Sequence, residues 1–127
     1  MKKIIIILCV YFSSVFGINV SGDISGNWTL ANSPYYVIGN VRVLSGQSLV
    51  IDPGVEVVFE GKYFIEVNGT LTCNGTVENN IYFYGSNDTR QGHLILNNLE
   101  SSNTFTHCKI ENLMSGSLYD DFNDGLW

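Results

Sequence analysis

The sequence is poor in basic residues and has no segment with helical periodicity. Six Lys and Arg stand against twelve Asp and Glu, which gives a formal net charge of −6 at pH 7. Such an acidic chain repels the phosphates of nucleic acids and anionic membrane surfaces, so we expect neither as a partner. After the first 17 residues, apolar residues nowhere recur at the 3, 4, 7 spacing of an amphipathic helix. We therefore predict an all-β protein.

The sequence also has no apolar run long enough to span a bilayer. Its N-terminus, MKKIIIILCVYFSSVFG, has two lysines, a short apolar run and then small residues. This layout is typical of a secretory signal peptide over residues 1–17, and a short transmembrane anchor is the alternative. Cleavage after Gly17 removes Lys2 and Lys3 and leaves four basic against twelve acidic residues, a net charge of −8. We expect a secreted or cell-surface protein, without membrane insertion once the signal is removed.

Residues 18–36 (INVSGDISGNWTLANSPYY) are rich in Gly, Ser and Asn and contain three large aromatic residues. Proline restricts the residue before it to extended geometry, so Ser33-Pro34 suits a turn. Large aromatics in an irregular lead-in usually cover the end of a core. We predict that this segment is an N-terminal cap.

Residues 37–113 show a regular alternation of short apolar segments and glycines. The segments centre near residues 42, 50, 57, 65, 72 and 82, and glycines at 39, 46, 54, 61, 69 and 75 separate them. Apolar residues alternate within each segment, as in half-buried strands. Asn68-Gly69 suits a meander of hairpins, whereas the glycine corners suit a parallel β-helix with about 22–25 residues per coil. The turns differ in sequence (SGQS, DPG, EGK, NGT), which favours the β-helix.

A coil of three strands fixes which strands stack. The strand centred at residue 42 then lies under the one centred at 65, that at 50 under that at 72, and that at 57 under that at 82. Beyond these, residues 84–92 form a polar loop, and further strands lie around Ile95 and Lys109. Residues 114–127 form an irregular acidic tail.

Two cysteines remain after signal removal, Cys73 and Cys108. An even pair in an exported protein permits one disulfide but does not require it. The three-strand register puts strands 72 and 109 on one side of the coil, so both cysteines point inward and stack. A disulfide between stacked strands is often strained, and we expect two free thiols that act as small apolar residues.

The segments SPYYVIGNVRVLSGQSLVIDPGVEVVFEG, VNGTLTCNGT and IYF carry a family resemblance. Over residues 26–84 the chain resembles the first coils of bacterial secreted right-handed parallel β-helix proteins, which belong to the pectin-lyase-like superfold. TFTHCKIEN resembles a single repeat of the same fold. The resemblance implies a right-handed β-helix, here incomplete. Members of this superfold include polysaccharide lyases, hydrolases, adhesins and proteins without known activity, so the fold alone does not assign a function.

No catalytic, cofactor-binding or metal-binding residues stand out. The charged residues predicted to point outward are Arg42, Glu56, Lys62, Glu66, Glu78, Arg90, Lys109 and Glu111. We interpret Arg42 and Glu66 as a surface ion pair across stacked strands. DDFNDG (Asp120–Gly125) resembles a calcium loop, but it lacks the spacing and the distal Glu of an EF-hand, which favours a solvated tail. His93 and His107 have no third ligand at metal spacing.

Four N-x-T sequons begin at Asn27, Asn68, Asn74 and Asn87. Asparagine followed by glycine also suits a turn, and we favour turn chemistry over glycosylation for these residues.

Two functions remain open. The first is an exported, adhesin-like β-helix scaffold that binds glycans and is a fragment of a longer chain. The second is the N-terminal part of a polysaccharide lyase or glycoside hydrolase that acts on an acidic polysaccharide. An uncapped coil exposes strand edges and an apolar core, so we expect further coils or a self-associating partner at the open end.

Overall fold

The computed structural model describes residues 17–87, 90–97 and 103–114, and this part of the chain is all-β. It contains eleven strands and one short 3-10 helix, η1 (Leu30–Asn32). The strands are β1 (Ile18–Asp23), β2 (Gly26–Trp28), β3 (Tyr35–Val43), β4 (Ser48–Ile51), β5 (Glu56–Phe59), β6 (Phe64–Val67), β7 (Thr70–Asn74), β8 (Ile81–Gly85), β9 (His93–Leu96), β10 (Thr104–Thr106) and β11 (Cys108–Glu111). The predicted fold class is confirmed at this level. Within these residues, no helix is long and apolar enough to cross a membrane.

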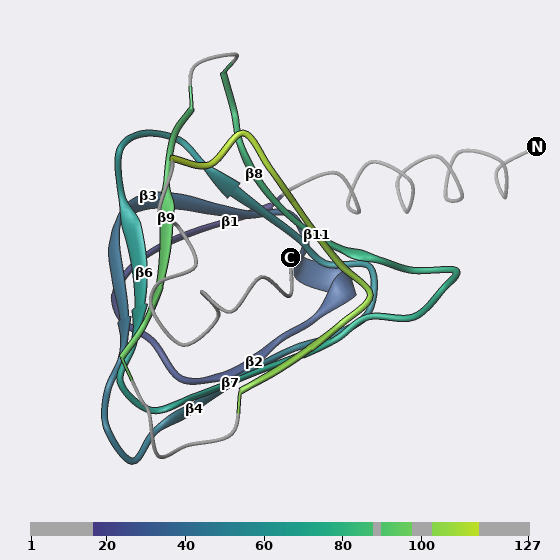
Figure 1. Ribbon diagram of the computed structural model, residues 1–127, viewed down its shortest axis with the longest axis horizontal. Coiled ribbons are helices and arrows are strands. Elements are labelled where there is room, and N and C mark those ends of the chain that lie inside the picture. The colour runs from purple at the N-terminus through teal and green to yellow at the C-terminus, as the bar shows by residue number, and fades with distance from the viewer. Residues whose placement is uncertain (1–16, 88–89, 98–102, 115–127) are drawn as a thin grey trace, which may run out of the picture.

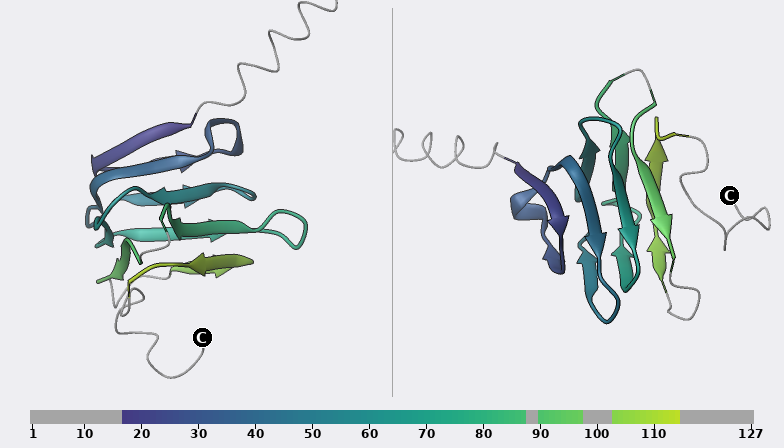
Figure 2. Two further views of the ribbon diagram at one scale, coloured as in Figure 1. Left: turned by 90° about the horizontal axis from the view of Figure 1, so that it is seen from above. Right: turned by 90° about the vertical axis from the view of Figure 1, so that its left-hand side faces the viewer.

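The strands form two parallel sheets that curl around three sides (Figure 1). The larger sheet has the order β11-β8-β5-β3-β6-β9, with β1 also paired to β3, and the smaller sheet has the order β10-β7-β4-β2. The long strand β3 belongs to two sides: its first half pairs with β5 and its second half pairs with β6. Figure 2 shows the successive turns of the chain stacked on one another.

The predicted stacking of the first strands is confirmed. Arg42 pairs with Glu66, Val50 pairs with Thr72, and Glu56 pairs with Tyr82. Each of these pairings is parallel, which excludes a meander of hairpins for these strands because two-residue turns join antiparallel strands.

The prediction of an irregular lead-in is wrong. Residues 18–23 and 26–28 are strands, and they pair with β3 and β4 as an additional layer. Two of its three aromatic residues, Trp28 and Tyr35, nevertheless cover the core as expected, whereas Tyr36 points outward. The rings of Trp28 and Tyr35 stack with their centroids 4.6 Å apart and their planes at 12°, and both side chains are buried.

The predicted register of the last coil is also wrong. TFTHCKIEN forms two strands instead of one, because His107 takes a left-handed backbone conformation (φ 49°) and turns the chain between them. β10 therefore stacks on β7, while β11 stacks on β8 on the next side. The two cysteines still come close across this corner: the Sγ atom of Cys108 lies 4.0 Å from the carbonyl oxygen of Cys73, and both thiols are free.

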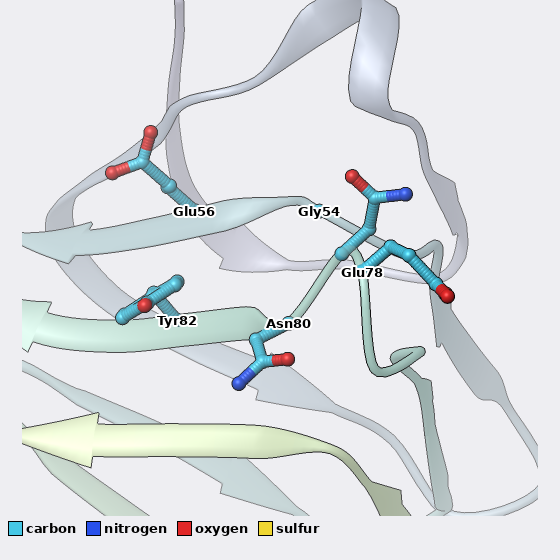
Figure 3. A pocket seen from close by; sticks show the side chains of 6 residues that line it. Gly54, Glu56, Glu78, Asn80 and Tyr82 are labelled. Atoms are coloured by element: carbon cyan, nitrogen blue, oxygen red, sulfur yellow. The ribbon is translucent and has the colours of Figure 1, made fainter.

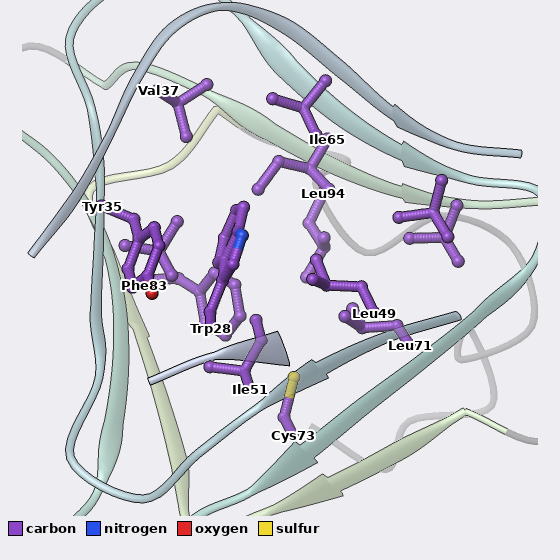
Figure 4. Packing of buried hydrophobic residues seen from close by; sticks show 14 of the residues in the cluster. Trp28, Tyr35, Val37, Leu49, Ile51, Ile65, Leu71, Cys73, Phe83 and Leu94 are labelled. Carbon is purple, nitrogen blue, oxygen red and sulfur yellow. The ribbon is translucent and has the colours of Figure 1, made fainter. Parts of the chain in front are cut away.

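The inward side chains of all three sides form one apolar core (Figure 4). The largest fully buried residues are Phe59, Phe83, Leu49, Ile51, Ile65, Leu71, Ile81, Leu94 and Leu96. Cys73 belongs to this core, and Cys108 packs against it while half-buried. The described residues leave no buried side-chain nitrogen or oxygen atom without a hydrogen bond. The alternation seen in the sequence thus builds the inner wall of the coil.

Candidate functional site

One outer side of the coil carries three partly exposed tyrosines. We call it the tyrosine face: the outward side chains of β5, β8, β11 and the first half of β3, namely Tyr36, Glu56, Tyr82, Tyr84 and Lys109. These residues point outward because their neighbours Val57 and Phe83 occupy the core.

The parallel register arranges this face in two columns. Glu56, Tyr82 and Lys109 are successive partners in one column. Tyr36, Val58 and Tyr84 are successive partners in the other. Val58 points outward but is only 3% exposed, since it stands between the two tyrosines. The face is therefore a packed aromatic surface with charged groups at its edges.

Two polar contacts hold the aromatic side chains in place. The hydroxyl of Tyr84 donates a hydrogen bond of 2.9 Å to Oε1 of Glu56. Partial burial, together with this bond and the charge of Glu56, raises the pKa of Tyr84 to about 12. The Nζ atom of Lys109 lies 3.1 Å from Glu111 and 5.5 Å from the centroid of the Tyr82 ring. The hydrogen bond to Glu111 raises the pKa of Lys109, so the lysine stays charged beside the ring.

A cleft of about 370 Å³ opens at the end of this face where β5 and β8 begin. It is lined by Gly54, Glu56, Glu78, Asn79, Asn80 and Tyr82. Figure 3 shows Glu56 and Tyr82 on neighbouring strands, with Glu78 and Asn80 at the loop that leads into β8. The cleft thus brings together two carboxylates, two amides and one aromatic ring.

Backbone hydrogen bonds shape the two turns that border the cleft. The N–H of Gly54 donates to the carbonyl of Asn79 (3.1 Å), which ties the turn before β5 to the loop before β8. Within that loop, the N–H of Thr76 donates to the carbonyl of Asn79 (3.0 Å), and the N–H of Asn79 donates to Oγ1 of Thr76 (3.1 Å). Gly54 has a φ of +80°, which a residue with a side chain rarely adopts. The lining residues are therefore placed by a fixed local framework.

A second polar cluster lies on the side formed by β6 and β9. The predicted ion pair is confirmed: Nε of Arg42 lies 3.1 Å from Oε1 of Glu66. Glu66 also accepts hydrogen bonds from the side-chain amides of Asn68 (3.3 Å) and Asn97 (3.1 Å). The sequence did not predict these amide partners. Because the four groups bond to one another on an exposed surface, we interpret this cluster as a structural ladder.

The other charged and metal-candidate residues are not brought into a site. Lys62 and Arg90 are exposed and do not line the cleft. His93 begins β9, and His107 lies at the corner between β10 and β11. The described part of the chain holds no group of three possible metal ligands. The acidic motif at residues 120–125 lies outside the described residues.

Asn27 is the middle residue of β2, so turn chemistry is wrong for it, whereas Asn74 ends β7 and Asn68 and Asn87 follow β6 and β8. Nδ2 of Asn27 donates to Asp52 (3.1 Å), and Asn68 belongs to the cluster around Glu66. Asn74 and Asn87 are exposed.

Sequence reasoning named Glu56 and Glu78 only as outward charges and missed the cleft that they share with Asn79, Asn80 and Tyr82. One signal was present, because the predicted stacking of strands 57 and 82 already placed Glu56 beside Tyr82. No protein family, no curated protein and no solved structure matches this chain.

Proposed function

We propose that the protein is an exported right-handed parallel β-helix scaffold, secreted or held at the cell surface, that binds polysaccharide on its tyrosine face. The N-terminal signal pattern supports export. The stacked parallel strands on three sides support a β-helix. Connections between parallel strands of one sheet are almost always right-handed, and the resemblance to the pectin-lyase-like superfold points the same way.

The cleft beside Tyr82 is the observation that carries the binding proposal. Ligand sites are typically concave, of about 300–1,000 Å³, with an apolar wall and a few placed polar groups. This cleft has about 370 Å³, the ring of Tyr82, and the side chains of Glu56, Glu78 and Asn80. A sugar ring offers a C–H face that packs on an aromatic ring and hydroxyls that bond to carboxylates and amides.

A binding measurement with a matched pair of variants tests this proposal. The purified chain is titrated calorimetrically with a panel of soluble polysaccharides. We expect Tyr82→Ala to weaken binding about tenfold, because an aromatic contact of about 1.4 kcal/mol corresponds to that factor. Phe64→Ala, which removes an outward aromatic side chain from β6, should leave binding unchanged. Equal loss in both variants, or no binding to any polysaccharide, contradicts the proposal.

A glycoside hydrolase is the second candidate, because Glu56 and Glu78 line one cleft. Most glycosidases use two carboxylates that flank the scissile bond. A lyase would instead need a basic residue beside its substrate, and the six lining residues include none. Under this alternative the chain is the N-terminal part of a polysaccharide-degrading enzyme. Release of reducing ends by the native chain, abolished in both Glu56→Gln and Glu78→Gln, would favour it over pure binding.

A further inference from the structure

We propose that the cleft selects neutral, hydroxyl-rich polysaccharides and rejects acidic ones. This inference rests on the proposed polysaccharide binding and names the class of ligand. It differs from the acidic polysaccharide expected for the enzyme alternative of the sequence analysis.

The charges that face the cleft are the first reason. Glu56 and Glu78 both line it, and neither has a basic partner among the other four lining residues. Lys109 neighbours Tyr82 on the same face, but its ammonium group is paired with Glu111 at 3.1 Å. A uronic acid in this cleft would bring a third carboxylate close to two others. Like charges at short range repel.

The mixture of donors and acceptors is the second reason. Carboxylates only accept hydrogen bonds, whereas the amides of Asn79 and Asn80 both donate and accept. A sugar hydroxyl also donates and accepts, so it can use both kinds of group. The lining therefore suits the hydroxyls of a neutral sugar.

The orientation of Glu56 is the third reason. The Tyr84 hydroxyl donates to Oε1 of this carboxylate at 2.9 Å, which holds the carboxylate against Tyr84, while Glu56 and Tyr82 are partners on neighbouring strands. A carboxylate held next to an aromatic ring can accept from hydroxyls at the edge of a sugar that packs on the ring. This acceptor is already ordered in the free protein, so ligand binding loses less conformational entropy at Glu56.

Matched ligands give a direct test. Each neutral polysaccharide of a panel (glucan, mannan, xylan, galactan) is compared by calorimetry with its own carboxylated derivative. We expect at least one neutral polysaccharide to bind, and to bind at least tenfold more tightly than its carboxylated derivative. Added salt should narrow this difference, since ions screen the repulsion.

Isosteric variants locate the selectivity. Glu78→Gln keeps the size of the side chain and removes one charge, so it should bring the carboxylated derivative closer to the neutral polysaccharide. Glu66→Gln makes the same change outside the cleft and should leave the ratio unchanged. Equal or tighter binding of the carboxylated derivatives would overturn this inference and leave polysaccharide binding intact. Failure of every polysaccharide to bind would overturn the proposed function itself.

Discussion

Gly69 offers a sharp test of how the corners of the coil are packed. It lies between β6 and β7, where its N–H donates to the carbonyl of Val43 (3.0 Å). The next residue, Thr70, donates its N–H to the carbonyl of Gln47 (2.9 Å). A β-carbon on Gly69 would meet the backbone carbonyl oxygens of Gln47 and Leu44. Because these atoms are backbone, no side-chain rotation can relieve the clash.

The magnitude follows from these contacts. Forcing the corner apart weakens two hydrogen bonds, each worth about 1 kcal/mol, and overpacking adds about 1–3 kcal/mol. We expect Gly69→Ala to lower the free energy of unfolding by about 3–5 kcal/mol, a large part of the roughly 5–15 kcal/mol of a typical domain.

Gly46→Ala is the matched control. Gly46 also lies at a corner, with a φ of +81°, but a β-carbon on this residue would meet no heavy atom within 4 Å beyond its own residue and its two chain neighbours. Its cost is the left-handed conformation, about 1–2 kcal/mol, reduced by about 0.4–1 kcal/mol through the stiffer unfolded chain. Urea unfolding followed by circular dichroism measures both variants. A loss in Gly69→Ala no larger than that in Gly46→Ala would refute the close-packed corner.

Two further predictions concern titratable side chains. Iodoacetamide should modify Cys108 in the folded chain and Cys73 only after unfolding. The hydrogen bond between the two thiols lowers the pKa of the half-buried Cys108. The same bond, together with burial, raises the pKa of Cys73. Peptide mass spectrometry reads both sites, and equal rates would contradict the prediction. Glu56→Gln should lower the pKa of Tyr84, seen in tyrosinate absorbance between about pH 9 and 13, because it removes a charge that opposes ionisation. Since this pKa is raised above its usual 10, the stability that Tyr84 contributes is complete below pH 10 and is lost as pH rises through about 12. A Glu56→Gln variant with unchanged tyrosinate titration and unchanged alkaline stability would contradict the hydrogen bond between Tyr84 and Glu56.

The strands that the sequence predicts best are those with strict alternation of apolar residues. Leu71 lies in such a strand, between outward Thr70 and Thr72, and its stacking partner Leu49 follows from the glycine spacing. β1 could not be predicted from alternation, because Val20 is its one buried residue. The corner at His107 could not be predicted either, because its left-handed backbone forms without the glycine that usually marks such a conformation.

The candidate site was only half accessible to the same reasoning. Strand register places Glu56 beside Tyr82, and alternation turns both outward. The cleft, however, depends on the loop of residues 75–80, whose hydrogen bonds to Gly54 and within Thr76–Asn79 leave no periodic trace in the sequence. An alternating pattern predicts which side chains of a strand point inward, whereas a cleft at a corner is formed by the loops that connect the strands.

The spacing between stacked residues indicates where this chain can accept insertions. Leu49 stacks on Leu71, 22 residues later, whereas Cys73 stacks on Phe105, 32 residues later. The inward positions thus stay in register although ten more residues separate the second pair. Loop closure becomes only slowly more costly with length, by about 0.6 kcal/mol for each doubling. The corners after β8 and β9 are therefore natural points for insertion, where peptides or whole modules could be displayed while the neighbouring strands keep their partners.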